Sequence, residues 1–140
     1  MHDLSSAEYQ ALAEFRFQIR RFLHFSEEQV RSRGLEPRQH QLLLAIRGLP
    51  DGTEATIGEL AERVQLKHHS TVELVDRLER QGYVARNASK EDRRQVIVHL
   101  TRKGIEVLRK LSLAHHQELE TTGPTLASVL RRLTRRRRVA

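Results

Sequence analysis

The stretch TIGELAERVQLKHHSTVELVDRLERQGYVARNASKEDRRQVIVHLT, residues 56–101, carries the pattern that decides the fold. Thr56 followed by Glu59 is a capping box, and the apolar residues behind it predict a short helix. After a tight connection at residues 65–67, a longer helix is predicted over residues 68–81, and the next glycine ends it. Two helices joined by so short a turn are typical of a helix-turn-helix.

The part that follows predicts a β-hairpin. Residues 83–86 and 95–100 have the alternating, β-branched character of strands. The residues between them, 87–94, are polar and turn-forming. A hairpin directly after a helix-turn-helix indicates a winged helix-turn-helix over residues 56–101.

The longer helix has two distinct sides when its residues are placed about 100° apart. One side is expected to pack against Leu60 and Val64, and it carries Thr71, Leu74, Val75 and Leu78. The opposite side is polar and free to meet base edges in a major groove, and it carries His69, Glu73, Asp76 and Arg80, with Ser70 and Arg77 on one flank. On its own, this pattern favours an ordinary amphipathic surface helix.

The tip of the predicted hairpin favours a DNA-binding helix over an ordinary surface helix. Its cations are Lys90, Arg93 and Arg94. They would lie where an adjacent minor groove runs, and arginine is favoured in narrow minor grooves, where the negative potential is strongest. Asp92 is expected to pair with one of the two arginines and shape the turn, while another arginine points outward. A charged tip can serve solubility alone, but the preceding helix pair favours a wing that contacts DNA.

Composition excludes several other classes. The 140-residue chain has no cysteine, which excludes disulfides, a thiolate nucleophile and cysteine-ligated zinc. Its formal net charge of +7 points to nucleic acid before membrane, although the run Arg135–Arg138 can be a solvated tail. No apolar run approaches the ~20 residues that span a bilayer and no signal peptide is evident, so we expect a soluble cytoplasmic protein. No nucleophile with an oriented base stands at a suitable spacing, so no enzymatic activity, catalytic residue or cofactor is predicted.

The N-terminal part of the chain predicts two helices. Ser5 and Glu8 form a capping box, and the long helix that follows is expected to end near Gly34. Pro37 suits the first turn of a second helix, which carries Leu42, Leu43, Leu44 and Ile46.

The C-terminal part also predicts two helices, the first capped by Thr101 and ended by Gly123-Pro124. The terminal helices of the chain carry apolar stripes: Leu12, Phe15, Ile19 and Phe22 at one end, and Leu126, Val129, Leu130 and Leu133 at the other. A chain this short cannot readily wrap a long helix around itself, so we expect these stripes to form an intersubunit interface rather than to pack within one chain. The predicted fold is mainly α with a small β-hairpin, in which a winged helix-turn-helix lobe joins a helical dimerisation region.

Over these residues the sequence resembles the MarR family of bacterial transcriptional regulators. TIGELAERVQL, STVELVDRLERQGYVAR and EDRRQVIVHLTRKG look like that family's helix-turn-helix, recognition helix and wing. The pattern DRR followed by LT and a glycine is more specific for this family than a lone helix-turn-helix is. The resemblance covers the whole chain in helix order and is strongest over residues 56–104. It implies a dimerisation helix at 1–36, a winged helix-turn-helix DNA-binding domain at 37–101 and C-terminal dimerisation helices at 102–140.

The resemblance also implies a function. A MarR-like protein would be a homodimer that binds a pseudopalindromic operator in double-stranded DNA, usually as a repressor relieved by a small ligand. Its two recognition helices would lie ~34 Å, or a multiple of that, apart. An anionic aromatic effector would lie in a cleft between the dimer domain and the DNA-binding lobe. Arg16, Arg20 and His24 could line that cleft or could be solvated charges, so the ligand-binding residues stay unassigned.

The candidate DNA-binding residues divide by role. Lys67 and His68 favour backbone contacts, the cations of the hairpin tip form the wing, and the residues that face the major groove are His69, Ser70, Glu73 and Arg77. The MarR family often starts its recognition helix with a serine; Lys67 stands in that place here, and loss of an N-cap side chain typically costs about 1 kcal/mol. Glu73 is unusual beside a polyanion and is expected to accept from a cytosine amino group or to hold Arg77 in place.

Two alternatives remain open at this point. The pairs His68-His69 and His115-His116 suggest metal binding as one hypothesis. Adjacent residues on a helix diverge by ~100°, however, so neither pair readily chelates one ion, and no metal site is predicted. His99, on a predicted strand, is interpreted as structural. The other alternative is a winged-helix protein-interaction module without specific DNA binding, which near-zero affinity for any duplex would favour.

Overall fold

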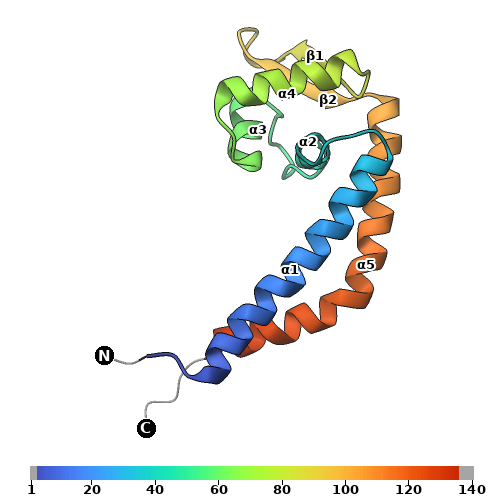
Figure 1. The fold of residues 1–140 in the computed structure, drawn as a ribbon. Helices are drawn as coiled ribbons and strands as arrows, with labels where there is room; N and C mark the ends of the chain where they lie inside the picture. The colour runs from blue at the N-terminus through green and yellow to red at the C-terminus, as the bar shows by residue number, and fades with distance from the viewer. Residues whose placement is uncertain (1–2, 136–140) are drawn as a thin grey trace. The chain divides into compact units, whose positions relative to one another are not determined.

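The computed structural model describes residues 3–135 of the chain. Its elements, in chain order, are α1 (Ser6–Ser32), α2 (Pro37–Arg47), α3 (Ile57–Val64), α4 (His68–Arg80), β1 (Val84–Ala88), β2 (Val96–Leu100) and α5 (Arg102–Thr134), drawn in Figure 1. The fold is mainly α with one hairpin, as predicted. Within the described part, no helix combines the length and the apolar character that crossing a membrane requires.

The described residues form two compact units. Residues 30–112 make one unit, which holds α2, α3, α4, the hairpin and the adjoining ends of α1 and α5. Residues 3–29 and 113–135 make the other, in which the rest of α1 meets the rest of α5.

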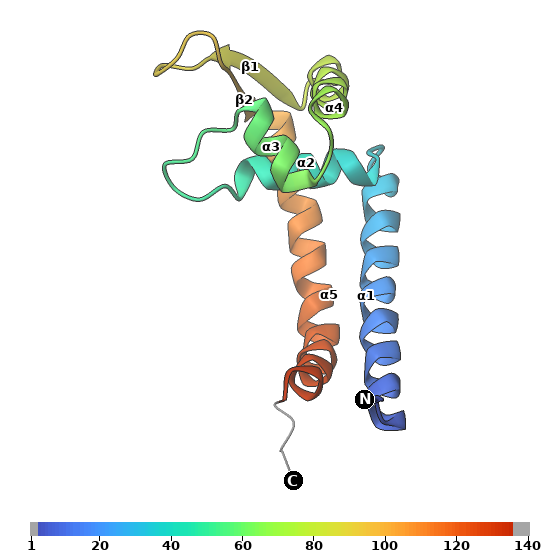
Figure 2. The same cartoon turned by 90° about the vertical axis from the view of Figure 1, so that its left-hand side faces the viewer.

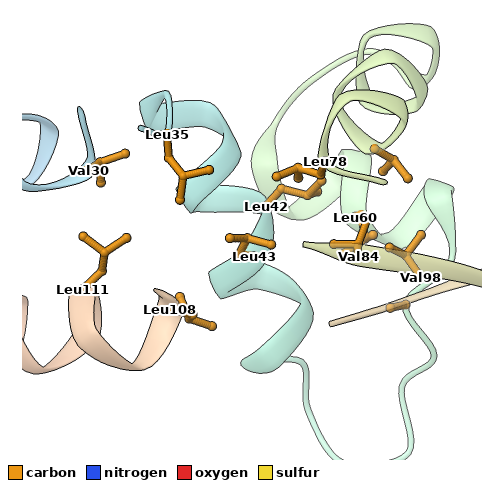
Figure 3. Close-up of a cluster of buried hydrophobic side chains, with 12 residues drawn as sticks. Val30, Leu35, Leu42, Leu43, Leu60, Leu78, Val84, Val98, Leu108 and Leu111 are labelled. Atoms are coloured by element: carbon orange, nitrogen blue, oxygen red, sulfur yellow. The ribbon is translucent and has the colours of Figure 1, made fainter. Parts of the chain in front are cut away.

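Residues 30–112 surround a single apolar core. Figure 3 shows its side chains converging from every element of this unit; the fully buried members are Val30, Leu35, Leu42, Leu43, Leu60, Val75, Leu78, Val98 and Leu111. Ala55, Val84 and Leu108 complete it. Burying a side chain of this size removes apolar area from water and contributes about 1.5–3 kcal/mol each, so this core fixes the helix-turn-helix and the hairpin together.

The helix starts confirm most of the local signals in the sequence. Ser5 Oγ accepts from Glu8 N at 3.2 Å, and Ser5 N donates to Glu8 Oε1 at 3.4 Å, so the first capping box is complete. At α3 the box is only half formed. Thr56 Oγ1 accepts from Glu59 N at 3.1 Å, whereas Thr56 N donates to the Glu54 carbonyl and the Glu59 carboxylate pairs with Arg63.

The hairpin pairs antiparallel over five residues, from Val84 opposite Leu100 to Ala88 opposite Val96. The first strand therefore runs two residues further than the predicted 83–86, because Asn87 and Ala88 still find partners across the ladder. A short extension joins the other side of β2: Thr56 bridges to Ile97, and Val98 N donates to the Ala55 carbonyl at 2.9 Å. The segment before α3 thus holds the hairpin against the core.

The C-terminal part corrects the prediction of two helices. The segment 102–134 is one helix of 33 residues, and Pro124 lies inside it. A proline removes one hydrogen bond and crowds the preceding turn, at a cost of about 3 kcal/mol, but its fixed φ is helical. Val129, five residues further on, is 2% exposed, and Leu126 and Leu133 are half-buried, so packing of the following turns offsets the lost bond and the helix continues.

Helices α1 and α5 meet through aromatic and apolar side chains in the second unit. His115 is buried and lies edge-on to the rings of Phe22 and Phe25, with centroids 5.9 and 6.2 Å away. Burial lowers the pKa of His115, which the hydrogen bond with the Ser26 backbone opposes. Of the predicted stripes, Val129 is buried, Phe15, Ile19, Phe22, Leu126 and Leu133 are half-buried, and Leu12 and Leu130 stay exposed.

The start of α5 lies in close contact with the end of α4. Thr101 Oγ1 donates to the Gly82 carbonyl at 2.6 Å and accepts from Gly104 N at 3.2 Å, which confirms Thr101 as the cap of α5. Gly82 takes a left-handed φ of +84°, and Thr101 N donates to the Tyr83 carbonyl at 3.0 Å. A Cβ added at Gly104 would stand 2.1 Å from that same carbonyl oxygen, so only glycine fits.

We expect Gly104→Ala to lower stability by about 2–4 kcal/mol, because the methyl group has no space against backbone and the two segments must separate. Urea unfolding at a fixed protein concentration measures the change. Gly58→Ala is the matched control, since a Cβ there meets nothing within 4 Å. If both variants unfold alike, the contact between Gly104 and Tyr83 does not constrain the fold.

Candidate nucleic-acid interface

The turn between α3 and α4 is built on Gln65. This residue adopts a left-handed φ of +56°, and Leu66 N donates to the Ala61 carbonyl at 3.0 Å. The left-handed residue ends α3 sharply and lets α4 begin three residues later. The helix-turn-helix predicted from the sequence is therefore present, with a non-glycine residue at its tightest point.

The inner side of α4 is the one that the sequence predicted. Thr71, Val75 and Leu78 are buried, and Leu74 is half-buried. Val75 and Leu78 share the core with Leu60, and Val64 packs at its edge. The Thr71 hydroxyl donates to the Lys67 carbonyl at 3.0 Å, so the one polar group on this side is satisfied.

The outer side of α4 presents most of the predicted contact residues to solvent. Ser70 is half-buried, and the exposed side chains are Lys67, His68, His69, Glu73 and Arg77. No side chain caps the start of this helix, in agreement with Lys67 at the N-cap. Within residues 3–135 no ion pair joins Glu73 to Arg77, so of the two expectations for Glu73 the intrahelical pair is not formed.

Asp76 corrects the prediction that it faces outward with the reading side. Arg86 of β1 donates through Nη2 to Asp76 Oδ1 at 2.6 Å and to Glu79 Oε1 at 2.9 Å. These contacts turn Asp76 toward the hairpin. The hydrogen bond from Arg86 lowers the pKa of Glu79, and the two carboxylates raise the pKa of Arg86. The sequence predicted Arg86 only as a strand residue, because its partners lie seven and ten positions away on another element.

The wing loop is closed by its own hydrogen bonds. Ser89 N donates to the Gln95 carbonyl and Gln95 N donates to the Asp92 carbonyl, both at 2.9 Å. Asp92 Oδ1 accepts from Arg94 N at 3.0 Å and lies 3.5 Å from Arg94 Nε. The prediction that Asp92 pairs with one arginine and shapes the turn is confirmed. Lys90, Arg93 and Arg94 are all exposed.

Ser89 anchors this loop to the rest of the fold. It is 2% exposed, and its hydroxyl donates to the Glu54 carboxylate, whose oxygens lie 3.2 Å away. The same oxygen accepts from Glu91 N and Asp92 N at 3.2 and 3.3 Å. Its sequence context predicted Ser89 only as a turn residue, since the contact to Glu54 spans 35 positions. It ties the cationic tip to the segment before α3.

The structure also locates the histidines and the residues that could line an effector cleft. Within residues 3–135 no group of His, Cys, Asp and Glu side chains is placed to hold a metal ion. His99 lies on the predicted strand, where it pairs with Ala85 across the hairpin, and its side chain is exposed. Arg20 and His24 line a surface hollow of about 550 Å³ on α1, together with Phe17, Arg21, Leu23 and Glu27. Arg16 is exposed and is not part of that hollow.

Helix-turn-helix, hairpin and cationic tip together define a winged helix-turn-helix. A family model described as the MarR family matches residues 33–95. YkoM of Bacillus subtilis (strain 168), an uncharacterized HTH-type transcriptional regulator, is 30% identical over 110 residues, which cover 75% of this chain and 68% of that protein. The chain belongs to the MarR family of transcriptional regulators, a family of regulators rather than enzymes.

Other relatives match over shorter parts or in fold. YfiV of Bacillus subtilis (strain 168) is 38% identical over 46% of this chain, and the chain spans only 40% of that regulator. The solved structure of AbsC, a MarR family transcriptional regulator from Streptomyces coelicolor, has a TM-score of 0.72 at 21% identity, covering 90% of this chain and 84% of AbsC. A mutant of S. aureus MepR bound to an oligodeoxyribonucleotide has a TM-score of 0.65 at 20% identity, covering 88% and 84%. These two structures show the shared fold.

The bridge from Arg86 to α4 predicts an acid-sensitive contribution to stability. Arg86 lowers the pKa of Glu79 below its ordinary value of 4.5, so the stabilisation is present above that pH and is lost as pH falls through the lowered pKa. Arg86→Ala should therefore lower the melting temperature at pH 7, and the gap to wild type should narrow as pH falls below 4.5 and through the lowered pKa of Glu79.

Arg80→Ala is the control for this experiment. Arg80 is exposed in the last turn of α4, and the described residues offer it no ion pair. Its small effect should not vary with pH in the same way. A gap for Arg86→Ala that stays constant from neutral to acid pH would mean that the bridge does not act through the carboxylates.

Proposed function

We propose that the chain is a homodimeric, DNA-binding transcriptional regulator whose α4 enters the major groove and whose wing contacts the adjacent minor groove. The observation that carries this proposal is the outer side of α4: its polar and cationic side chains face solvent while its inner side is locked into the core. A helix of this kind fits a groove about 12 Å wide. A second set of exposed cations stands at the tip of the neighbouring hairpin.

Each set of residues has a role in this proposal. His69, Ser70, Glu73 and Arg77 face the major groove, Lys67 and His68 meet the phosphate backbone, and Lys90, Arg93 and Arg94 enter or flank the minor groove. The net charge of +7 supports binding to a polyanion, because neutralising phosphates releases counterions. The family membership and the oligonucleotide bound to the MepR mutant support the same assignment.

The dimer is proposed from apolar surface in the unit formed by residues 3–29 and 113–135. Leu12, Leu23, Leu119 and Leu130 are each 40% exposed or more. A groove of about 470 Å³ lies nearby, lined by Leu4, Ala7, Glu8, Ala11, Leu12, Arg132, Leu133 and Arg135. A second copy of the same helices would cover this surface by a two-fold symmetric contact. The regions 1–36 and 102–140 would then dimerise and 37–101 would bind DNA.

The finer features of the function follow from the dimer. Two symmetric reading helices select a pseudopalindromic operator, and occupation of that operator would block a promoter in the cytoplasm. We propose that the protein represses and that a small anionic aromatic ligand releases it. The hollow beside Arg20 and His24 offers cations and the Phe17 ring for such a ligand.

Binding to duplex DNA is tested by fluorescence anisotropy with promoter fragments over a range of salt concentrations. Tight binding to one fragment, with a steep negative slope of log affinity against log salt, is expected. Wild type that binds no duplex at low salt would overturn the proposal and favour a protein-interaction module.

Replacing Arg94 with Ala should weaken operator binding by about tenfold or more, or roughly 1.4 kcal/mol, because its side chain is 93% exposed at the tip of the wing and is free to reach a phosphate. The dimer should stay intact. Arg109→Ala removes the same charge from α5, where Arg109 pairs with Glu106 at 2.8 Å, and should bind as wild type does. Equal affinity for both variants would remove the wing from the interface.

A charged residue on the exposed apolar surface should break the dimer. Leu130→Glu places an unpaired charge in the proposed interface, so sedimentation should show a monomer at concentrations where wild type is a dimer. Leu44→Glu is the matched control, since Leu44 is similarly exposed at 47% against 41% but lies on α2. A dimeric Leu130→Glu protein would place the interface elsewhere.

A further inference from the structure

A hollow of about 480 Å³ lies between the first turn of α2 and the flank of α4. Its lining from α4 includes Ser70, Glu73 and Arg77, and its lining from α2 includes Pro37, Arg38 and Gln39. Figures 1 and 2 both show α2 passing beneath α4. The hollow therefore shares one wall with the surface proposed to read DNA, and its other wall comes from the first turn of α2.

The position of the α2 wall is fixed by a buried amide. Gln39 is 5% exposed, and its Nε2 donates to Gln81 Oε1, just after α4, at 2.8 Å. Its Oε1 accepts from Glu36 N at 2.9 Å. Breaking this bond would leave the polar group of the buried Gln39 side chain without its partner, which is costly, so the first turn of α2 and the end of α4 keep their spacing. Arg38, the neighbour of Gln39, is held beside the recognition helix.

The charges around the hollow favour an oxyanion. The hollow is lined by three arginines, Arg31, Arg38 and Arg77, and by only two carboxylates, those of Glu36 and Glu73. Glu36 is engaged in the capping box at the start of α2. Arg38 and Arg77 are exposed, and neither forms an ion pair with any residue in 3–135. A guanidinium offers paired N–H donors that match phosphate and carboxylate oxygens, and the Ser70 hydroxyl adds another donor on the same wall.

We infer that Arg38 and Arg77 form an oxyanion site for a DNA backbone phosphate at the edge of the major groove that α4 enters. This inference rests on the proposed function. Contacts to phosphate and sugar make up half or more of the hydrogen bonds in protein–DNA interfaces, and they fix the register of a recognition helix. With Gln39 setting the spacing, Arg38 sets how α4 lies in the groove without itself touching a base.

The test compares Arg38→Ala with Arg47→Ala by anisotropy on the operator fragment over a range of salt concentrations. Arg47 lies in the last turn of the same helix, about 14 Å along its axis from Arg38, is exposed, and loses the same charge. Loss of one phosphate contact per protomer should reduce the salt slope by about 0.9, or about 1.8 per dimer. The preference for the operator over other fragments should be retained, and Arg47→Ala should keep the wild-type slope.

Two further measurements decide between sources of the oxyanion. If Arg38 and Arg77 hold one phosphate, the double variant should lose less affinity than the sum of the two single variants. Sodium benzoate, added at constant ionic strength, probes a small carboxylate as the alternative occupant. Benzoate binding that Arg38→Ala abolishes, with an unchanged salt slope, would assign the hollow to a small anion and overturn the phosphate site.

An unchanged slope without benzoate binding would also overturn it. A wild-type protein that binds no operator would instead contradict the proposed function itself, so the two failures are distinguishable.

Discussion

The contact between Gly104 and the Tyr83 carbonyl is the constraint on which the arrangement of the winged helix depends. A side chain at residue 104 would overlap that oxygen, and Thr101 donates both to the same carbonyl and to that of Gly82. Three segments therefore meet at one place: the residues just after α4, the start of the hairpin and the start of α5. Lys103 adds a further bond to the Gln81 carbonyl at 2.8 Å. A displacement of α5 at this point would be transmitted to α4 through short, direct contacts.

Polar contacts then hold α4 from its two flanks. Arg86 bridges Asp76 and Glu79 to the hairpin, and Gln39 joins the end of the helix to α2. The apolar core alone sets the depth of the helix, since Thr71, Val75 and Leu78 are fully enclosed. Directional hydrogen bonds restrict the rotation and the tilt of α4, because a hydrogen bond loses strength steeply when its geometry departs from linear. The wing is held in the same manner by the contact between Ser89 and Glu54. The outer side of α4 is thus carried by a helix that contacts the core, the hairpin and α2, rather than by a set of loops.

The sequence predicts the parts of this structure that depend on neighbouring residues. Capping residues Ser5 and Thr101, the inner side of α4, and the turn formed by Asp92 all rest on interactions within a few positions, and all are present. The errors arise where distant parts of the chain compete with a local signal. Packing of the last turns carries α5 through Pro124, and Arg86 draws Asp76 away from the outer side. The contacts of Ser89 and Gln39 join residues 35 and 42 positions apart, which no local pattern reveals. The contact residues on the outer side of α4 remain predictions, because exposure alone does not identify a ligand.

The separation of the two sides of α4 also affects how such a protein can diverge. His69, Glu73 and Arg77 make no contribution to the core, whereas the residues interleaved with them carry the packing. Substitutions at exposed positions of this kind usually change stability by less than about 0.5 kcal/mol. Gene duplication followed by drift at those few positions could therefore yield new target preferences while folding is preserved. The buried side of α4 stays constant while its exposed side chains can change. Selection on target recognition can therefore proceed almost independently of selection on stability.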